Sequence, residues 1–227
     1  MRLTALLTGD VRFQYKYGFY FIYVVFSVLY IGLLHAFPEA WRGKAAILMI
    51  FSDPSAMGLF FMGAILLFEK SEHVLNSIAV SPVKPLEYVL SKLVSIGIIA
   101  TIVGLAIGIS AGVVTHPFFF IAGVFLCSCI FSSIGLILAC KVSSLNQFVL
   151  ATIPAELLIN IPAVLWLFGY RRSWLALHPG VSMMTLCTGE GPLVPALLIL
   201  LLWTALMIFV ACHTVEKMLQ SVGGVTL

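Results

Sequence analysis

The sequence predicts an all-α integral membrane protein, a single transmembrane domain over residues 1–227 with six transmembrane helices. Of the 227 residues, 62% are hydrophobic and only 9% are charged, and the mean hydropathy is +1.15. A soluble domain has about a quarter of its residues charged, so this composition excludes one. Several apolar stretches are long enough to cross a membrane, which takes about 20 helical residues, and polar segments separate them.

Residues 1–17 predict an N-terminal interfacial helix. Apolar side chains recur there at every fourth position, with charged ones between them: Leu3, Leu7, Val11 and Tyr15 alternate with Arg2, Asp10, Arg12 and Lys16. A helix with two such faces can lie in the membrane interface. A cleaved signal peptide is excluded, because the apolar piece before Asp10 is too short and no small-residue cleavage site follows.

The first two spans are predicted at 18–37 and 47–68, with a loop at 38–44. Residues 18–37 contain no charged side chain, whereas Asp53 and Pro54 interrupt the second span. We favour a helix cap at Asp53 with Pro54 at the first helical position, where a proline loses no hydrogen bond. A buried acid at Asp53 is the alternative.

The third and fourth spans, 93–115 and 118–140, are predicted to form a hairpin. No formally charged residue occurs between Lys92 and Lys141, a run about twice the length of one span, so the chain must fold back. Pro117 lies at the midpoint of this run and predicts the turn.

A stripe of small residues runs along the third span: Ala100, Gly104, Gly108 and Gly112 recur every four positions. Such a stripe lets a second helix approach closely, so we favour a role in helix packing. A pore lining is the alternative.

The last two spans are predicted at 146–168 and 193–212. The fifth contains Pro154 and Pro162, so an irregular helix is expected. Between these spans, residues 169–192 mix aromatic, basic and apolar side chains. They predict short re-entrant helices, half-buried at the extracellular membrane surface.

A carboxylate near the middle of the fifth span, Glu156, must face protein or water, because an ionised acid in lipid is costly. Asn160 lies one helical turn further on the same face, which predicts an intramembrane polar network. We favour a structural hydrogen bond for Glu156. A position on a transport pathway is the alternative.

The longest polar interruption, residues 69–88, predicts a docking segment. A polar stripe at helical spacing lies beside an apolar one: Glu69, Glu72, His73 and Asn76 border Val74, Leu75, Ile78 and Ala79. We expect one short amphipathic helix that ends at Ser81-Pro82. Pro85 is expected to keep the following residues extended.

The basic residues predict which side of the membrane each loop occupies. Eight of the twelve lie on the side of the termini, and four lie opposite: Arg2, Arg12, Lys16, Lys70, Lys84, Lys92, Lys141 and Lys217 against Arg42, Lys44, Arg171 and Arg172. Both termini and the docking segment are therefore expected on the cytoplasmic side of the inner membrane. The net charge of +3 is too small and scattered to indicate nucleic acid binding.

Three common motifs are absent from the sequence: the nucleotide-binding pattern GxxxxGK[ST], the zinc-protease pattern HExxH and the serine-hydrolase pattern G-x-S-x-G. We therefore predict no catalytic residue, no cofactor and no metal site in this chain. The cysteines number five, and four of them lie in apolar runs, which favours packing over disulfides or metal binding.

The order of these features resembles the permeases of type-2 ABC exporters, which serve bacterial drug, lipid, polysaccharide and peptide export. The resemblance covers essentially the whole chain. Its most specific part is an acidic "EK-E" helix and an "SP" turn before the third span: Asp53-Pro54, Gly58, Gly63, Phe68 to Glu72, Ser81-Pro82 and Leu90 to Lys92. His73 departs from the family pattern, in which a small residue such as glycine is common.

The resemblance implies a half-transporter. Two permease chains, identical or paralogous, would work in the lipid bilayer with two separate ATP-binding cassette subunits, which bind ATP and Mg. Closure of those subunits would push on a cytoplasmic coupling helix within 69–88, and the spans would release a hydrophobic or amphipathic drug, lipid or peptide outward. The coupling residues implied are Glu69, Lys70, Glu72, His73, Val74, Leu75, Ile78 and Pro82.

Two other classes of function remain open. A secondary transporter could couple to protons through Glu156, although one acid deep in a span and no evident inverted repeat count against it. A membrane scaffold would need neither transport nor ATP. Copurification of an ATPase subunit with the solubilised chain would support the exporter alone.

Overall fold

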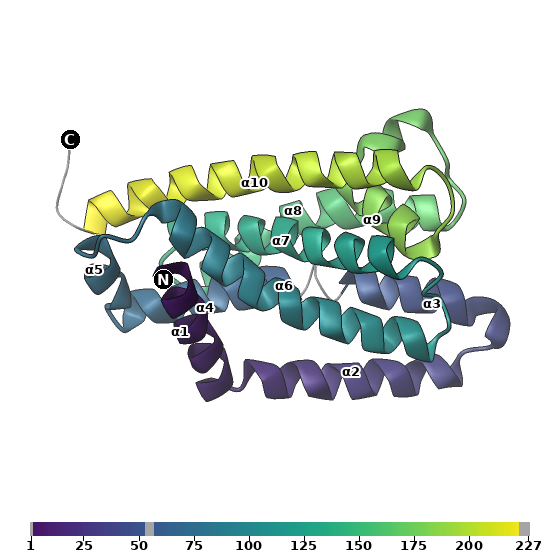
Figure 1. Cartoon of the computed structure of the whole chain (residues 1–227), viewed down its shortest axis with the longest axis horizontal. Coiled ribbons are helices and arrows are strands. Elements are labelled where there is room, and N and C mark those ends of the chain that lie inside the picture. Colours follow the sequence, from purple (N-terminus) through teal and green to yellow (C-terminus); the bar gives the residue numbers. More distant parts are fainter. Residues whose placement is uncertain (1, 53–56, 223–227) are drawn as a thin grey trace.

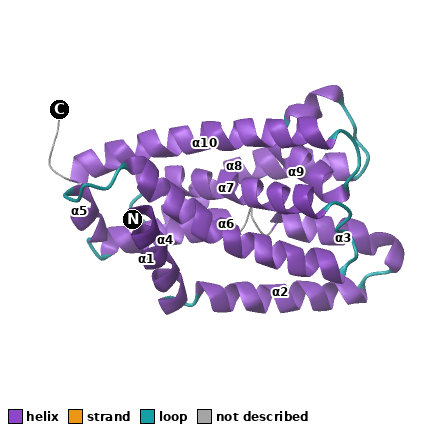
Figure 2. Cartoon of the chain, in the orientation of Figure 1, coloured by secondary structure: helices purple, strands orange, loops and turns teal. Residues whose placement is uncertain are grey.

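The computed structural model describes residues 2–52 and 57–222, which form helices joined by short loops (Figure 1, Figure 2). The predicted all-helical fold class is confirmed for this part of the chain. The helices are α1 (Arg2–Lys16), α2 (Phe19–Ala36), α3 (Glu39–Ser52), α4 (Leu59–Ser71), α5 (Val74–Ala79), α6 (Pro85–Ser110), α7 (Pro117–Lys141), α8 (Leu145–Leu167), the 3-10 helix η2 (Ser173–Leu177), α9 (Pro179–Thr188) and α10 (Leu193–Val222). The predicted cap at Asp53 and Pro54 lies outside the described residues.

The chain is a multi-pass membrane protein. Within the described residues, five helices are long and apolar enough to cross a membrane: α2, α6, α7, α8 and α10. In place of the predicted second span, α3 and α4 follow one another along the long axis of the bundle (Figure 1). Each of these two is shorter than a span, so length alone does not make either a crossing helix.

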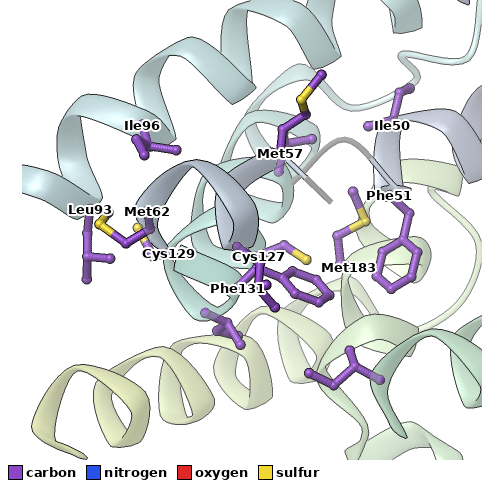
Figure 3. Close-up of a cluster of buried hydrophobic side chains, with 14 of the residues drawn as sticks. Ile50, Phe51, Met57, Met62, Leu93, Ile96, Cys127, Cys129, Phe131 and Met183 are labelled. Carbon is purple, nitrogen blue, oxygen red and sulfur yellow. The ribbon is translucent and has the colours of Figure 1, made fainter. Parts of the chain in front are cut away.

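The core is centred on α7, which packs against α4, α6, α9 and α10. Figure 3 shows part of it, where Phe51 and Phe131 meet edge to face at 5.9 Å between ring centroids, beside Cys127 and Met183. In α6 and in α7, 61% of the residues of the apolar membrane-spanning stretch are buried inside the chain. The corresponding share is 17% in α2 and in α10, and 22% in α8. These three outer helices therefore leave apolar faces for lipid or for another protein.

Small residues explain how closely the central helices approach. An added Cβ at Gly104 would lie 3.1 Å from a Val124 methyl, and one at Gly108 would lie 2.7 Å from the Phe120 ring. Gly112 is predicted in the same stripe, but it follows the end of α6, with φ of 68° and open space around it. It is a turn residue, because this left-handed conformation favours glycine.

The first turn of α6 corrects the prediction for Pro85. The helix begins at Pro85, eight residues before the predicted span at 93–115, and Pro85 occupies the first helical position. A proline fits there, since that N–H would lack a helical partner anyway. The Glu87 carboxylate also accepts the backbone N–H of Lys84 at 3.0 Å, which closes the helix start.

Three further boundaries differ from the predictions. The predicted loop at 38–44 is helical from Glu39. The polar tail after residue 212 continues α10 to Val222, because Val215 and Met218 are buried and α10 packs against α5. The fifth span remains one continuous helix through Pro154 and Pro162, as neighbouring groups in a membrane bundle can compensate the lost hydrogen bonds.

The segment between α8 and α10 forms two short helices, η2 and α9. Apart from Leu175, η2 is exposed, whereas Pro179 to Cys187 of α9 is buried. The expectation of two half-buried helices is therefore wrong for α9, which packs against α3, α7, α8 and α10 at one end of the bundle.

Candidate functional site

The predicted docking segment lies at the end of the bundle that also holds α1 and the carboxyl end of α10 (Figure 1). It is two helices rather than the single one expected. α4 ends at Ser71, and α5 begins at Val74. His73, between them, has a φ of 57°, a left-handed conformation that breaks a helix and suits glycine best.

Glu69, expected on a docking face, points into the bundle instead. Its carboxylate accepts the Tyr88 hydroxyl at 2.5 Å and pairs with the Lys92 ammonium at 2.5 Å. The side chain is buried, so it ties α4 to α6 and is not available to a partner.

Lys70 also turns toward its own chain. Its ammonium donates to the carbonyl oxygens of Ala139, Cys140 and Val142, at 2.6, 3.1 and 2.9 Å. Ala139 and Cys140 supply two of the last carbonyls of α7, which lack helical partners and carry the negative end of the helix dipole, and Val142 follows directly after the helix. Burial lowers the pKa of the Lys70 ammonium. Lys70 therefore caps α7.

Glu72 and His73 are exposed, and Glu72 accepts a hydrogen bond from the Tyr17 hydroxyl. This bond raises the pKa of the Tyr17 phenol. It connects the end of α4 to the turn between α1 and α2.

The apolar stripe of α5 mostly faces its own chain. Leu75 is only 2% exposed and belongs to the core, while Val74 and Ile78 are half-buried. This burial changes the role expected for Leu75, because its replacement would disturb the fold before any partner. Pro82 is exposed, and Val80 is 84% exposed.

Val80 lies on a shallow cavity between α5 and the carboxyl end of α10. The cavity has a volume of about 410 Å³, and its lining includes Val83, Leu219 and Gln220. An exposed valine beside a partly apolar hollow is the feature of this segment most suited to contact with another protein.

A buried ion cluster at this end was missed by sequence reasoning. Lys92 is 1% exposed and pairs with Glu69 on α4 and, at 3.0 Å, with Asp10 on α1. The Ser91 hydroxyl donates to Asp10 at 2.7 Å, and the Gln14 amide donates to Ser95 at 2.7 Å. Polar residues at helical spacing in the first turns of α6 were the available signal.

The ion cluster explains the orientation of α1. Asp10 and Gln14 face α6, while Leu3, Val11 and Tyr15 are exposed. Three of the four residues of the apolar stripe therefore point away from the chain, and Leu7 is half-buried; this orientation suits a helix in the membrane interface.

Glu156 and Asn160 are both half-buried on α8. Within the part of the chain that the structure describes, neither side chain has a hydrogen-bond partner. Their immediate surroundings are exposed apolar side chains, including Ile153, Leu157 and Leu158. The polar network predicted around Glu156 stays a prediction, and any partner must come from water or from another chain.

Comparisons with known proteins give one consistent result. The model of the fluoroquinolones export permease protein family matches residues 1–218. Two curated proteins, the fluoroquinolones export permease proteins of Mycobacterium tuberculosis strains CDC 1551 / Oshkosh and ATCC 25618 / H37Rv, are each 25% identical over 165 residues. The matched region covers 72% of this chain and 70% of each relative.

Proposed function

This chain belongs to the fluoroquinolones export permease protein family, and from that premise we propose that it is the membrane subunit of a type-2 ABC exporter. It moves a hydrophobic or amphipathic drug-like compound outward. ATP and Mg bind to a separate ATP-binding cassette subunit, because this sequence contains no nucleotide-binding motif. The relatives are named for fluoroquinolone export, so fluoroquinolones are the first substrates to test.

The observation that carries this proposal is the attachment of α5 to the bundle. Leu75 anchors α5 in the core, and the adjacent α4 is joined to α6 through Glu69 and Lys92 and to α7 through Lys70. A force applied to α5 therefore reaches α6 and α7 through α4, and it reaches α10 through direct contact, as a coupling helix requires. Val80 and the cavity beside α10 offer the docking surface for the ATPase subunit.

We further propose that a second permease chain packs against the outer helices and that both termini lie in the cytoplasm. α3 and α4 together act as the second span, which completes six. The exposed apolar faces of α2, α8 and α10 exceed what a soluble surface carries, and lipid covers those that the second chain leaves open.

The test is coexpression of the chain with a candidate ATP-binding cassette subunit, followed by copurification and efflux of a fluoroquinolone from proteoliposomes. We expect ATP-dependent efflux. Val80→Asp should abolish ATPase binding and efflux, because it puts a charge in the docking surface, yet it should leave folding intact since Val80 is exposed. The matched control is Ser173→Asp, exposed at the opposite end.

Other results would assign other functions. Efflux that follows a proton gradient without any ATPase would favour a secondary transporter. A stable complex that transports nothing, with fluoroquinolones or other amphipathic compounds, would favour a scaffold.

A further inference from the structure

An apolar cavity lies between α1, α5 and the start of α6. Its volume is about 460 Å³, which is within the range of small-molecule sites. Leu6, Phe13, Val74, Ile78 and Val83 supply apolar parts of its lining.

The polar part of the lining is the ion cluster of Asp10, Glu69 and Lys92. Two carboxylates share one ammonium, which leaves one formal negative charge in excess. The side chains of Lys92, Asp10 and Glu69 are only 2%, 11% and 8% exposed, so water screens this charge poorly. Buried charge without a counterion is costly, and the site therefore favours a further cation.

The residues that could supply that cation from this chain are engaged elsewhere or absent from the cavity. Lys70 follows Glu69 directly but donates to the end of α7. Arg12 and Lys16 are exposed on α1. Among the described residues that line the cavity, Lys92 is the one base.

We propose that this cavity binds an amphipathic organic cation of drug size. Its charged nitrogen lies against Asp10, each of whose oxygens accepts one hydrogen bond here and keeps capacity for another. Its apolar body lies among the side chains of α1 and α5, where Phe13 of α1 offers aromatic surface. The placement of this site on a path for export rests on the proposed function, whereas binding itself does not.

Gly9 provides a way to close the cavity without touching a charge. It lines the cavity, and a Cβ added there meets no atom within 4 Å. Gly9→Leu therefore projects a side chain into open space. Leucine is also a better helix former than glycine, so α1 should not be weakened.

The test measures binding of ethidium, a fluorescent aromatic cation, to the purified chain in phosphatidylcholine nanodiscs. Anilinonaphthalene sulfonate, an amphipathic anion, is the probe of opposite charge. We expect saturable ethidium binding that weakens at least tenfold in Asp10→Asn and in Gly9→Leu. Anion binding should not fall in either variant. Glu216→Gln, which removes an exposed carboxylate at the same end, should bind ethidium like the wild type.

Equal ethidium binding by the wild type, Asp10→Asn and Gly9→Leu would overturn the proposal. If Asp10→Asn unfolds, Gly9→Leu decides alone, since it retains the ion cluster. A different pair of results would also refute the proposal: the wild type does not bind ethidium, and Gly9→Leu weakens binding of the ATPase subunit. The cavity would then be a contact site for the partner subunit.

Efflux assays separate this inference from the proposed function. Ethidium binding that responds to both variants, in a chain that exports nothing, would leave the site standing and remove the exporter. If the chain instead supports ATP-dependent efflux of a fluoroquinolone but does not bind ethidium in isolation, the exporter stands and the cation site is refuted.

Discussion

Lys92 joins three helices at one end of the bundle, through Asp10 on α1 and Glu69 on α4. The three side chains are almost inaccessible to water, so each depends on the others for its charge balance. Removal of one partner from a buried ion pair leaves a charge that neither water nor protein compensates. The cluster is therefore a strong determinant of how α1 and α4 lie against α6.

We predict that Lys92→Met lowers the free energy of unfolding by about 3–5 kcal/mol, the usual cost of a buried pair that loses one member. The measurement is denaturant unfolding in mixed micelles, followed by tryptophan fluorescence. Lys84→Met is the matched control, because Lys84 is exposed near the same end. Equal stability of the two variants would mean that the cluster contributes nothing to folding.

Contacts between individual residues were the feature least predictable from the sequence. Asp10, Glu69 and Lys92 stand far apart in the sequence. The sequence pattern predicts Asp10 on the charged face of an interfacial helix, Glu69 in a docking stripe and Lys92 as a topology marker. Their contact depends on how α1, α4 and α6 cross, which no local pattern encodes. His73 is a contrasting case: the resemblance to type-2 ABC exporter permeases implies a small residue such as glycine there, and the left-handed backbone at His73 is a conformation that glycine adopts most easily.

At the scale of helices, the contact between α4 and α7 is the closest backbone approach among the glycine sites described. A Cβ at Gly135 on α7 would lie 2.3 Å from the carbonyl oxygen of Leu59 on α4. Backbone cannot move aside as a flexible side chain does, so the two helices would have to separate.

We predict that Gly135→Ala destabilises the chain by about 1–3 kcal/mol, the range for overpacked cores. Thermal unfolding in detergent would measure it. Gly32→Ala is the control, because a Cβ at Gly32 meets nothing within 4 Å. An unchanged unfolding temperature in Gly135→Ala would show that α4 and α7 are not held as closely as described.

The five long apolar helices were predictable because hydropathy alone selects membrane helices. The predicted second span, 47–68, is replaced by the two shorter helices α3 and α4. Helix ends were less predictable. α6 starts early since Pro85 and Glu87 make a good helix start; this signal is local and lies in the sequence, but Pro85 was instead expected to keep the chain extended. α10 runs past its apolar stretch because Val215 and Met218 are buried, a tertiary contact that the composition of the span does not encode.

At the scale of the whole molecule, the helices run between two ends (Figure 1). α4, which ends at Ser71, and the carboxyl end of α10, which contains Gln220, lie near one end. α9, against which η2 with Ser173 packs, lies near the other end. All three residues are exposed. We predict that cysteines at Ser71 and Gln220 react only with reagents that reach the cytoplasm, and that one at Ser173 reacts from outside intact cells.

A background with Cys140 and Cys212 changed to serine is needed for that labelling, because the other native cysteines are buried. Labelling of Ser71→Cys from outside would reverse the orientation expected from the basic residues. Labelling of Ser71→Cys and Gln220→Cys from opposite sides would instead exclude the six-span topology.

In the proposed pair of permease chains, Glu156 is the residue that would decide how α8 meets the second chain. It is half-buried on a helix whose neighbouring side chains are exposed and apolar, and a carboxylate facing lipid would cost roughly 2.5–3.5 kcal/mol on insertion scales. A second permease chain packed against α8 would supply both the missing apolar cover and a polar partner. Glu156→Gln keeps the shape and the capacity for hydrogen bonds, whereas Glu156→Leu removes both.

We therefore predict that Glu156→Gln retains dimerisation and transport, while Glu156→Leu shifts the chain toward monomer in light scattering of the detergent complex. Leu202→Ala, on the exposed face of α10, controls for a general loss of apolar contact. The contrary result would be informative: if Glu156→Gln keeps a stable dimer and normal basal ATP hydrolysis but no longer transports a cationic substrate, the carboxylate contacts the substrate. The face of α8 around Glu156 would then line the pathway rather than the interface between the two chains.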